Sequence, residues 1–261
     1  MKFNPRLLKA LEARGLAEPT LAQSSAWPTI ASGSNVLLIA PTGVGKTEAA
    51  MVPLFHKLLE EESRPITVLY ITPLRSLNRD MLRRLKDIGE ELEISVAVRH
   101  GDTTAYERTR QSKNPPQILI TTPETLQIML SGKRLRENLK GIQAVIVDEV
   151  HELASSERGA QLSIGLERLV LLSGEFQRIG LSATVGTPDE VGAFLVGDRK
   201  VEIITPDLER KMDLLVHAPE PVPEDDELVN ELYWEPERVA ALRYSAKASE
   251  MGPTLLFVNT R

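Results

Sequence analysis

The sequence predicts an α/β protein built on a parallel β-sheet with helices on both faces. Short apolar runs alternate with helical patterns over the first two hundred residues, which is typical of successive βαβ units. The runs at 36–39 (VLLI) and 144–147 (AVIV) are continuously apolar, as expected of strands that are buried on both faces. The expected strands are 36–39, 68–71, 96–98, 118–120, 145–147, 179–181 and 201–204.

Apolar residues at helical spacing predict helices between these strands. One series comprises Leu77, Met81, Leu85, Ile88 and Leu92, and a second comprises Leu162, Leu166, Leu169 and Val170. A helix that joins two parallel strands crosses over one face of the sheet, and ligands of such sheets bind at the carboxyl ends of the strands. The loops that follow the strands are therefore the place to look for chemistry.

The composition fits one full α/β domain and part of another. The chain has 261 residues, of which 42% are hydrophobic and 26% charged, so it can bury a sizeable core. It contains no cysteine, which excludes a disulfide framework and thiolate metal sites and agrees with a reducing cytosol.

No apolar stretch approaches the length of a membrane span, and the amino terminus has no secretory apolar core. The expected location is the cytoplasm, with no membrane partner. The net charge of -6 and a pI near 5.4 give no bulk attraction for nucleic acid. A nucleic-acid site in this chain would have to be a local groove.

The first chemical motif is Ala40–Thr47 (APTGVGKT), directly after the strand expected at 36–39. Gly43 and Gly45 permit backbone angles and a close approach that side chains would forbid, so loop N–H groups can wrap a triphosphate. Lys46 would place its charge at the β- and γ-phosphates, and Thr47 would offer a hydroxyl to Mg²⁺. The motif predicts ATP and Mg²⁺ as cofactors, with ATP bound by Thr42, Gly43, Val44, Gly45, Lys46 and Thr47.

The second motif, Asp148–His151 (DEVH), follows the strand expected at 145–147. Asp148 can bind the Mg²⁺ ion through a water molecule of its coordination shell, and Glu149 can orient or deprotonate the attacking water. Either motif alone recurs by chance, and Ala40 stands where the usual loop has its first glycine. Both in this order, each behind a buried strand, favour one ATP site with Lys46, Asp148 and Glu149 as catalytic residues.

The composition changes at 219–227 (PEPVPEDDE), a proline-rich acidic stretch typical of a connector or surface loop. Beyond it we expect a helix over 236–250 and a buried strand at 254–259 (TLLFVN). The predicted domains are residues 1–205, which bind ATP, and residues 206–261, a linker with the incomplete start of a second domain. This second segment is too small to form its own core.

A set of motifs in order along the chain resembles the first RecA-like domain of a superfamily 2 helicase, a P-loop NTPase fold. The resemblance is greatest to the large helicase-related (Lhr) family of DEVH-box helicases, and related helicases act in DNA repair and RNA processing. It covers residues 1–205 and resumes at 254–261 (TLLFVNTR), which resembles the opening motif of a second RecA-like domain. The motifs are Gln23, 40–47, 72–78 (TPLRSLN), 100–103 (HGDT), 121–125 (TTPET), 148–151 and 182–184 (SAT).

The resemblance implies roles for residues outside the two ATP motifs. Gln23 matches a glutamine whose amide donates to and accepts from the adenine edge. Ser182 and Thr184 would hydrogen-bond to the loop 148–151 and so link the nucleotide state to the second domain. His151 is expected to be a coupling hydrogen-bonding residue rather than a metal ligand, since no histidine or cysteine lies at ligand spacing from it.

Two groups of residues are expected to contact the phosphates of a nucleic-acid strand. Each follows a strand and opens a helix, where backbone N–H groups and short polar side chains can bind phosphates. Simple helix capping is the alternative interpretation of these positions. The groups are Thr72, Pro73, Arg75 and Asn78, and Thr122, Pro123 and Glu124.

These patterns predict an ATP-dependent helicase or translocase that acts on single-stranded DNA or RNA. The second RecA-like domain, with its catalytic arginine, and further C-terminal domains are expected as missing partners, so the chain alone would be weak or inactive. Two alternatives stay open: a translocase or remodeller that moves along duplex without separating strands, and a non-catalytic nucleic-acid-binding adaptor. Contacts to phosphates and sugars carry too little base information to decide between DNA and RNA.

Overall fold

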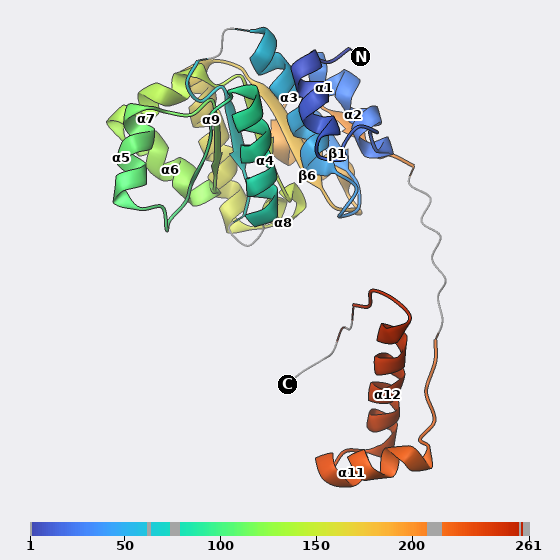
Figure 1. The fold of residues 1–261 in the computed structure, drawn as a ribbon. Helices are drawn as coiled ribbons and strands as arrows, with labels where there is room; N and C mark the ends of the chain where they lie inside the picture. Colours follow the sequence, from blue (N-terminus) through green and yellow to red (C-terminus); the bar gives the residue numbers. More distant parts are fainter. Residues whose placement is uncertain (1, 62–63, 74–78, 208–215, 256, 258–261) are drawn as a thin grey trace. The chain divides into compact units, whose positions relative to one another are not determined.

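The computed structural model describes residues 2–61, 64–73, 79–207, 216–255 and 257 (Figure 1). The chain divides into two compact units, residues 1–208 and residues 209–261. None of the described helices is both long enough and apolar enough to span a bilayer. The first unit contains the sheet and both ATP motifs.

The first unit contains a seven-stranded sheet with the order β3-β4-β2-β5-β6-β1-β7, in which every neighbouring pair is parallel. This arrangement confirms the predicted fold class. Each expected strand is present, with ends that differ by at most two residues from the expected ones. The strands are β1 (Val36–Ile39), β2 (Val68–Ile71), β3 (Val96–Arg99), β4 (Ile118–Thr121), β5 (Ala144–Val147), β6 (Gln177–Ser182) and β7 (Glu202–Ile204).

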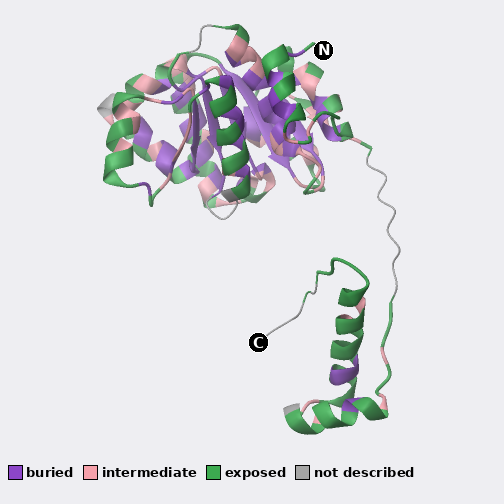
Figure 2. Cartoon of the chain, viewed as in Figure 1, coloured by how far each residue is buried: buried purple, intermediate pink, exposed green. Residues whose placement is uncertain are grey.

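Helices cover both faces of this sheet, and Figure 2 shows its five central strands buried, whereas the edge strands β3 and β7 are partly exposed. Successive residues of a strand point to opposite faces, so Leu38 packs in one apolar core and Leu37 in the other. The first core is completed by α1 (Pro5–Glu12), α2 (Leu21–Ala31), α3 (Lys46–Glu60) and α4 (Arg79–Leu92). The second is completed by α6 (Pro123–Ser131), η2 (Leu139–Gly141), α8 (Val150–Ala154), α9 (Glu157–Ser173) and α10 (Pro188–Val196).

The predicted apolar stripes lie on the buried faces of α4 and α9. Met81, Leu85, Ile88 and Leu92 are buried, as are Leu162, Leu166 and Leu169, whereas Val170 is partly exposed and Leu77 lies outside the described residues. Two further helices, α5 (Ala105–Lys113) and α7 (Lys133–Asn138), complete the described helices of this unit.

The strand β6 begins two residues earlier than expected because its first two residues are polar but buried. The Gln177 amide donates to the carbonyls of Ile30 (2.8 Å) and Ser34 (2.7 Å). Arg178 is 2% exposed and donates to the Leu195 carbonyl (3.1 Å) and to Glu167 (2.9 Å). Buried polar groups with partners do not interrupt a strand, so apolar pattern alone cannot find this strand end.

The second unit contains η3 (Pro223–Asp225), α11 (Asp226–Leu232) and α12 (Pro236–Glu250), so the expected helix at 236–250 is confirmed. Arg243 binds the buried carboxylate of Asp225 at 2.8 Å. The buried strand expected at 254–259 is wrong for the described residues: 254, 255 and 257 form no strand, and Leu255 and Phe257 are 85% and 90% exposed. The described part of this unit offers no sheet to pair with; residues 256 and 258–259 lie outside it.

Candidate nucleotide-binding site

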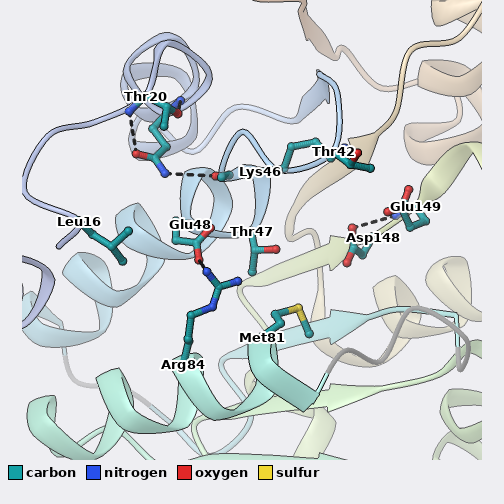
Figure 3. Close-up of a pocket in the computed structure, with 13 residues that line it drawn as sticks. Leu16, Thr20, Thr42, Lys46, Thr47, Glu48, Met81, Arg84, Asp148 and Glu149 are labelled. Atoms are coloured by element: carbon teal, nitrogen blue, oxygen red, sulfur yellow. Dashed lines mark hydrogen bonds and ion pairs between the residues drawn. The ribbon is translucent and has the colours of Figure 1, made fainter. Parts of the chain in front are cut away.

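Both ATP motifs line one pocket of about 700 Å³ at the carboxyl ends of β1 and β5 (Figure 3). Eight of the nine predicted ATP-binding residues lie in its wall, namely Gln23, Thr42, Gly43, Gly45, Lys46, Thr47, Asp148 and Glu149. Val44 is the exception; its carbonyl accepts a hydrogen bond from the Thr20 hydroxyl at 2.8 Å. The pocket also has walls that the motifs did not indicate, formed by Leu16, Thr20, Glu48, Met81 and Arg84.

The phosphate loop depends on two glycines with left-handed backbone angles. Gly43 has a φ of 82° and Gly45 a φ of 81°, in the region that side chains disfavour. Gly45 is also the N-cap of α3, and a Cβ atom there would collide with the side-chain amide of Gln23. The loop is therefore packed closely against α2 at Gly45 and is open at Gly43.

Lys46 begins α3 and is buried in the loop, with 8% of its surface exposed. Its ammonium donates to the carbonyls of Ala40 (2.7 Å) and Pro41 (3.4 Å). Burial lowers the pKa of this ammonium, and the charges of Glu149 and Asp148 oppose the shift. A cation enclosed by loop carbonyls at the positive end of a helix suits a polyphosphate anion.

Asp148 is held at the end of β5 by hydrogen bonds to both carboxylate oxygens. Its Oδ2 accepts from the Tyr70 hydroxyl at 2.7 Å, and its Oδ1 accepts from the Glu149 N–H at 3.0 Å. Burial raises the pKa of Asp148, although the Tyr70 hydrogen bond opposes this rise. Burial and the charge of Asp148 raise the pKa of Tyr70 well above its ordinary value, so the phenol remains a donor.

The oxygens of Thr47 and Asp148 fit a magnesium ion. Mg²⁺ prefers hard oxygen ligands and is usually held by one or two carboxylates together with substrate phosphates. The hydroxyl and the carboxylate both line the pocket, close to the loop that would bind the phosphates. Among the described residues, no group of three or more histidines and carboxylates forms a metal site by protein ligands alone.

Glu149 and His151 connect the end of β5 to the loop after β6. Glu149 has a φ of 46° and is the N-cap of α8, so the chain turns sharply at this residue. Nδ1 of His151 lies 3.6 Å from Oε2 of Glu149 and accepts the Ala183 N–H at 3.3 Å. This geometry makes His151 a bridge between two loops.

The hydrogen bonds expected from Ser182 and Thr184 to the 148–151 loop stay a prediction, and in this structure the loop is bound through Ala183. The Ser182 hydroxyl donates instead to the neighbouring carbonyl of Ala183 at 2.8 Å, and Thr184 is exposed. The Ser182 carbonyl accepts from the Ala40 N–H at 3.0 Å, at the start of the phosphate loop. Ala40 and Ser182 meet through main-chain groups because β1 and β6 are neighbours in the sheet.

Gln23 is 5% exposed, and its amide is bound to the protein's own backbone. Its Oε1 accepts from the Thr20 N–H (3.0 Å) in a capping box at the start of α2, and its Nε2 donates to the Gly45 carbonyl (3.4 Å). Gln23 therefore supports the phosphate loop directly. Its predicted contact with adenine stays a prediction.

An ion pair that motif analysis missed joins α3 to α4 at the floor of the pocket. Oε1 of Glu48 lies 3.0 Å from a guanidinium nitrogen of Arg84, and Figure 3 shows the pair beside Thr47. Glu48 follows the metal-shell threonine, and α4 begins directly after the 72–78 block. The pair depends on packing of two helices far apart in sequence, so no local signal identifies it.

The residues expected to contact nucleic acid at the end of β2 are buried where the structure describes them. Thr72 is fully buried, and its N–H donates to the Thr121 carbonyl at 3.0 Å. Pro73 is buried as well. Arg75 and Asn78 lie outside the described residues.

At the end of β4, helix capping describes the predicted group well. Thr122 is 3% exposed and caps α6 by accepting the Thr125 N–H at 3.4 Å. Pro123 is the first residue of the helix, and the exposed Glu124 is ion-paired with Arg158. The Thr122 hydroxyl also donates to the Thr125 hydroxyl at 3.1 Å, so it is engaged within the first turn of the helix.

A family model for DEAD/DEAH box helicases matches residues 20–191. The Lhr helicase/uracil glycosylase of Escherichia coli K12 is 41% identical over 228 residues, which cover 79% of this chain and 15% of that protein. The ATP-dependent helicase Lhr-Core of Methanothermobacter thermautotrophicus is 40% identical over 266 residues, which cover 93% of this chain and 30% of that protein.

Among solved structures, Mycobacterium smegmatis helicase Lhr bound to ssDNA and AMP-PNP superposes with a TM-score of 0.75 at 35% identity. The match covers 95% of this chain and 36% of that one. The chain thus spans between 15% and 36% of the length of these relatives. The resemblance to Lhr helicases is confirmed, and the chain belongs to the DEAD/DEAH box helicase family.

Proposed function

We propose that this chain is the ATP-binding part of an ATP-dependent helicase or translocase that moves along or unwinds nucleic acid. The observation that carries the proposal is that Lys46, Asp148 and Glu149, from two motifs a hundred residues apart, line one pocket. The relatives named ATP-dependent helicases support it, as does the Lhr structure with bound ssDNA and AMP-PNP.

In the proposed reaction, residues of this chain bind the phosphates of ATP and orient and activate the attacking water. The N–H groups of the phosphate loop and the ammonium of Lys46 bind the β- and γ-phosphates, which requires the ammonium to leave the Ala40 carbonyl. Mg²⁺, when bound, neutralises charge that develops on the phosphates. Thr47 would hold it directly and Asp148 through water.

Glu149 is placed to orient the attacking water and to accept its proton. The water attacks the γ-phosphate in line with the bond to the leaving ADP. The left-handed turn at Glu149 presents its carboxylate to the pocket next to Asp148. His151 lies between this carboxylate and the Ala183 N–H, so a change in the position of the carboxylate would alter the loop after β6.

The nucleic-acid partner is proposed to be a single strand of DNA or RNA. We assign its phosphates to the helix starts after β2 and β4, with Arg75, Asn78 and the first turn of α6 as the contacts. A second RecA-like domain would supply the opposite side of the groove and the arginine that stabilises the transition state. The much greater length of the relatives supports such additional domains.

Single-turnover hydrolysis of radiolabelled ATP, with enzyme in excess, tests this function in a protein that carries this chain together with the proposed second RecA-like domain. We expect ATP cleavage that single-stranded oligonucleotides accelerate and that Glu149→Gln slows on the order of a hundredfold or more. Glu152→Gln, an exposed carboxylate on the same helix, is the matched control. Acceleration by duplex alone would favour the duplex translocase, and cleavage that Glu149→Gln leaves unchanged would refute the proposal.

A further inference from the structure

Tyr70 places a hydroxyl group among the apolar residues of the first core. It lies on β2, is fully buried, and is flanked in the sheet by Ile120 of β4 and Ile146 of β5. Both neighbours are aliphatic and belong to this apolar core. A phenylalanine would fill the same space without a polar group, so packing does not explain the hydroxyl.

The Tyr70 hydroxyl reaches the residues that would hold Mg²⁺. It donates to Oδ2 of Asp148 at 2.7 Å, and the Thr47 side chain partly offsets the rise in the pKa of the phenol. The other Asp148 oxygen is bound by the Glu149 N–H. The buried phenol of β2 therefore fixes one oxygen of Asp148, the residue at the end of β5 proposed to act on Mg²⁺.

A carboxylate that acts through a metal-bound water must keep its oxygens in a fixed direction. Partners outside the ligand shell provide this orientation, and their loss typically costs tenfold to a hundredfold in metal affinity. Without the phenol, the largely buried carboxylate of Asp148 would lose one of its two donors, the one that binds Oδ2. The carboxylate could then turn away from the pocket.

We propose that Tyr70 is a positioning residue that holds the Asp148 carboxylate in the orientation that accepts Mg²⁺ with the nucleotide. The inference rests on the proposed function, because it concerns the metal of the ATP site. Tyr70 touches neither nucleotide nor water in this role; it acts through Asp148.

The test is a Mg²⁺ titration of the 261-residue chain with a fluorescent ADP, read as nucleotide binding rather than as hydrolysis. Tyr70→Phe keeps the ring and removes only the hydroxyl. We expect the Mg²⁺ concentration at half-maximal nucleotide binding to rise on the order of tenfold, with metal-free ADP affinity nearly unchanged.

Two further variants separate positioning from stability. Thr67→Val removes the buried hydroxyl that bonds the Arg64 carbonyl at the other end of β2, so it should leave the Mg²⁺ midpoint unchanged. Replacing Tyr70 with p-aminophenylalanine restores an N–H donor and should return the midpoint toward that of the wild type. It also provides a folded test should Tyr70→Phe be unstable.

The effect should also depend on Asp148. In an Asp148→Asn background, Tyr70→Phe should shift the midpoint much less, since the carboxylate it orients is gone. A wild-type chain without Mg²⁺-dependent ADP binding would refute the proposed function. Normal binding in the wild type, with a midpoint that Tyr70→Phe leaves within twofold, would overturn the role of Tyr70 alone.

Discussion

The backbone N–H of Ala183 donates to Nδ1 of His151 at 3.3 Å, and this contact joins the loop after β6 to the loop after β5. His151 also lies 3.6 Å from Glu149, the proposed base. A movement of the Glu149 side chain on nucleotide binding can therefore be transmitted to Ala183 through His151 alone. The carbonyl of Ser182, the residue before Ala183, accepts the Ala40 N–H at the start of the phosphate loop. The SAT segment thus contacts both halves of the nucleotide site.

Removing the imidazole of His151 should uncouple the loop after β5 from the loop after β6 without preventing nucleotide binding. In a protein that also carries the proposed second RecA-like domain, we expect His151→Ala to keep ADP affinity within about twofold while it lowers the oligonucleotide acceleration of single-turnover ATP cleavage severalfold. His217→Ala, in the second unit, is the control. Equal acceleration in His151→Ala and in the wild type would show that the contact carries no coupling.

The two glycines of the phosphate loop should tolerate alanine unequally. Both have φ near 80°, where alanine costs roughly 1 kcal/mol, but only at Gly45 would the new Cβ collide with Gln23. Urea unfolding should therefore give a larger loss of stability for Gly45→Ala than for Gly43→Ala. Gly101→Ala, with an ordinary φ and open space, should cost least. The reverse order at 43 and 45 would contradict the packing of the loop on α2.

The raised pKa of Asp148 gives a pH-dependent prediction for the nucleotide-free chain. A carboxyl whose pKa is higher in the folded state than in the unfolded state lowers stability as pH rises from its ordinary pKa through the raised value. Asparagine resembles the protonated form. The free energy of unfolding of Asp148→Asn should therefore exceed that of the wild type at pH 7, and the difference should shrink toward pH 4.

Denaturant unfolding at several pH values measures this difference. Asp198→Asn, a substitution of an exposed surface carboxylate, serves as the control for the loss of one charge. An Asp148→Asn variant that is less stable than the wild type at pH 7, with the deficit shrinking at pH 4, would show that the ionised carboxylate stabilises the fold.

The parts of the site that the sequence predicts are those specified by short motifs. Gly43, Gly45 and Lys46 are adjacent in sequence and at the start of α3, so the loop chemistry can be derived from the motif alone. The roles of Asp148 and Glu149 can be predicted because two acidic residues come directly after an apolar run typical of a buried strand. The fold class follows from seven apolar runs, since continuous burial of strands requires helices on both faces.

The remaining features depend on contacts between distant segments. Tyr70 meets Asp148 because β2 lies beside β5, an order that the sequence pattern does not specify. Thr72 has the residue type of a phosphate contact, yet its N–H pairs with Thr121 of the neighbouring strand and the residue is buried. Strand order and depth are tertiary properties, and periodicity carries no information about either.

Calorimetric titration of AMP-PNP with Mg²⁺ into the wild-type chain and into Lys46→Ala tests the central claim most directly. The ammonium of Lys46 is the charge that the phosphate loop provides, and a hydrogen bond to a charged group contributes roughly 1.5–3 kcal/mol. We predict binding by the wild type and by the control Lys57→Ala, on the outer part of the same helix. For Lys46→Ala we predict an affinity lower by on the order of a hundredfold. Equal affinities in Lys46→Ala and the wild type would contradict the assignment of this pocket as an ATP site.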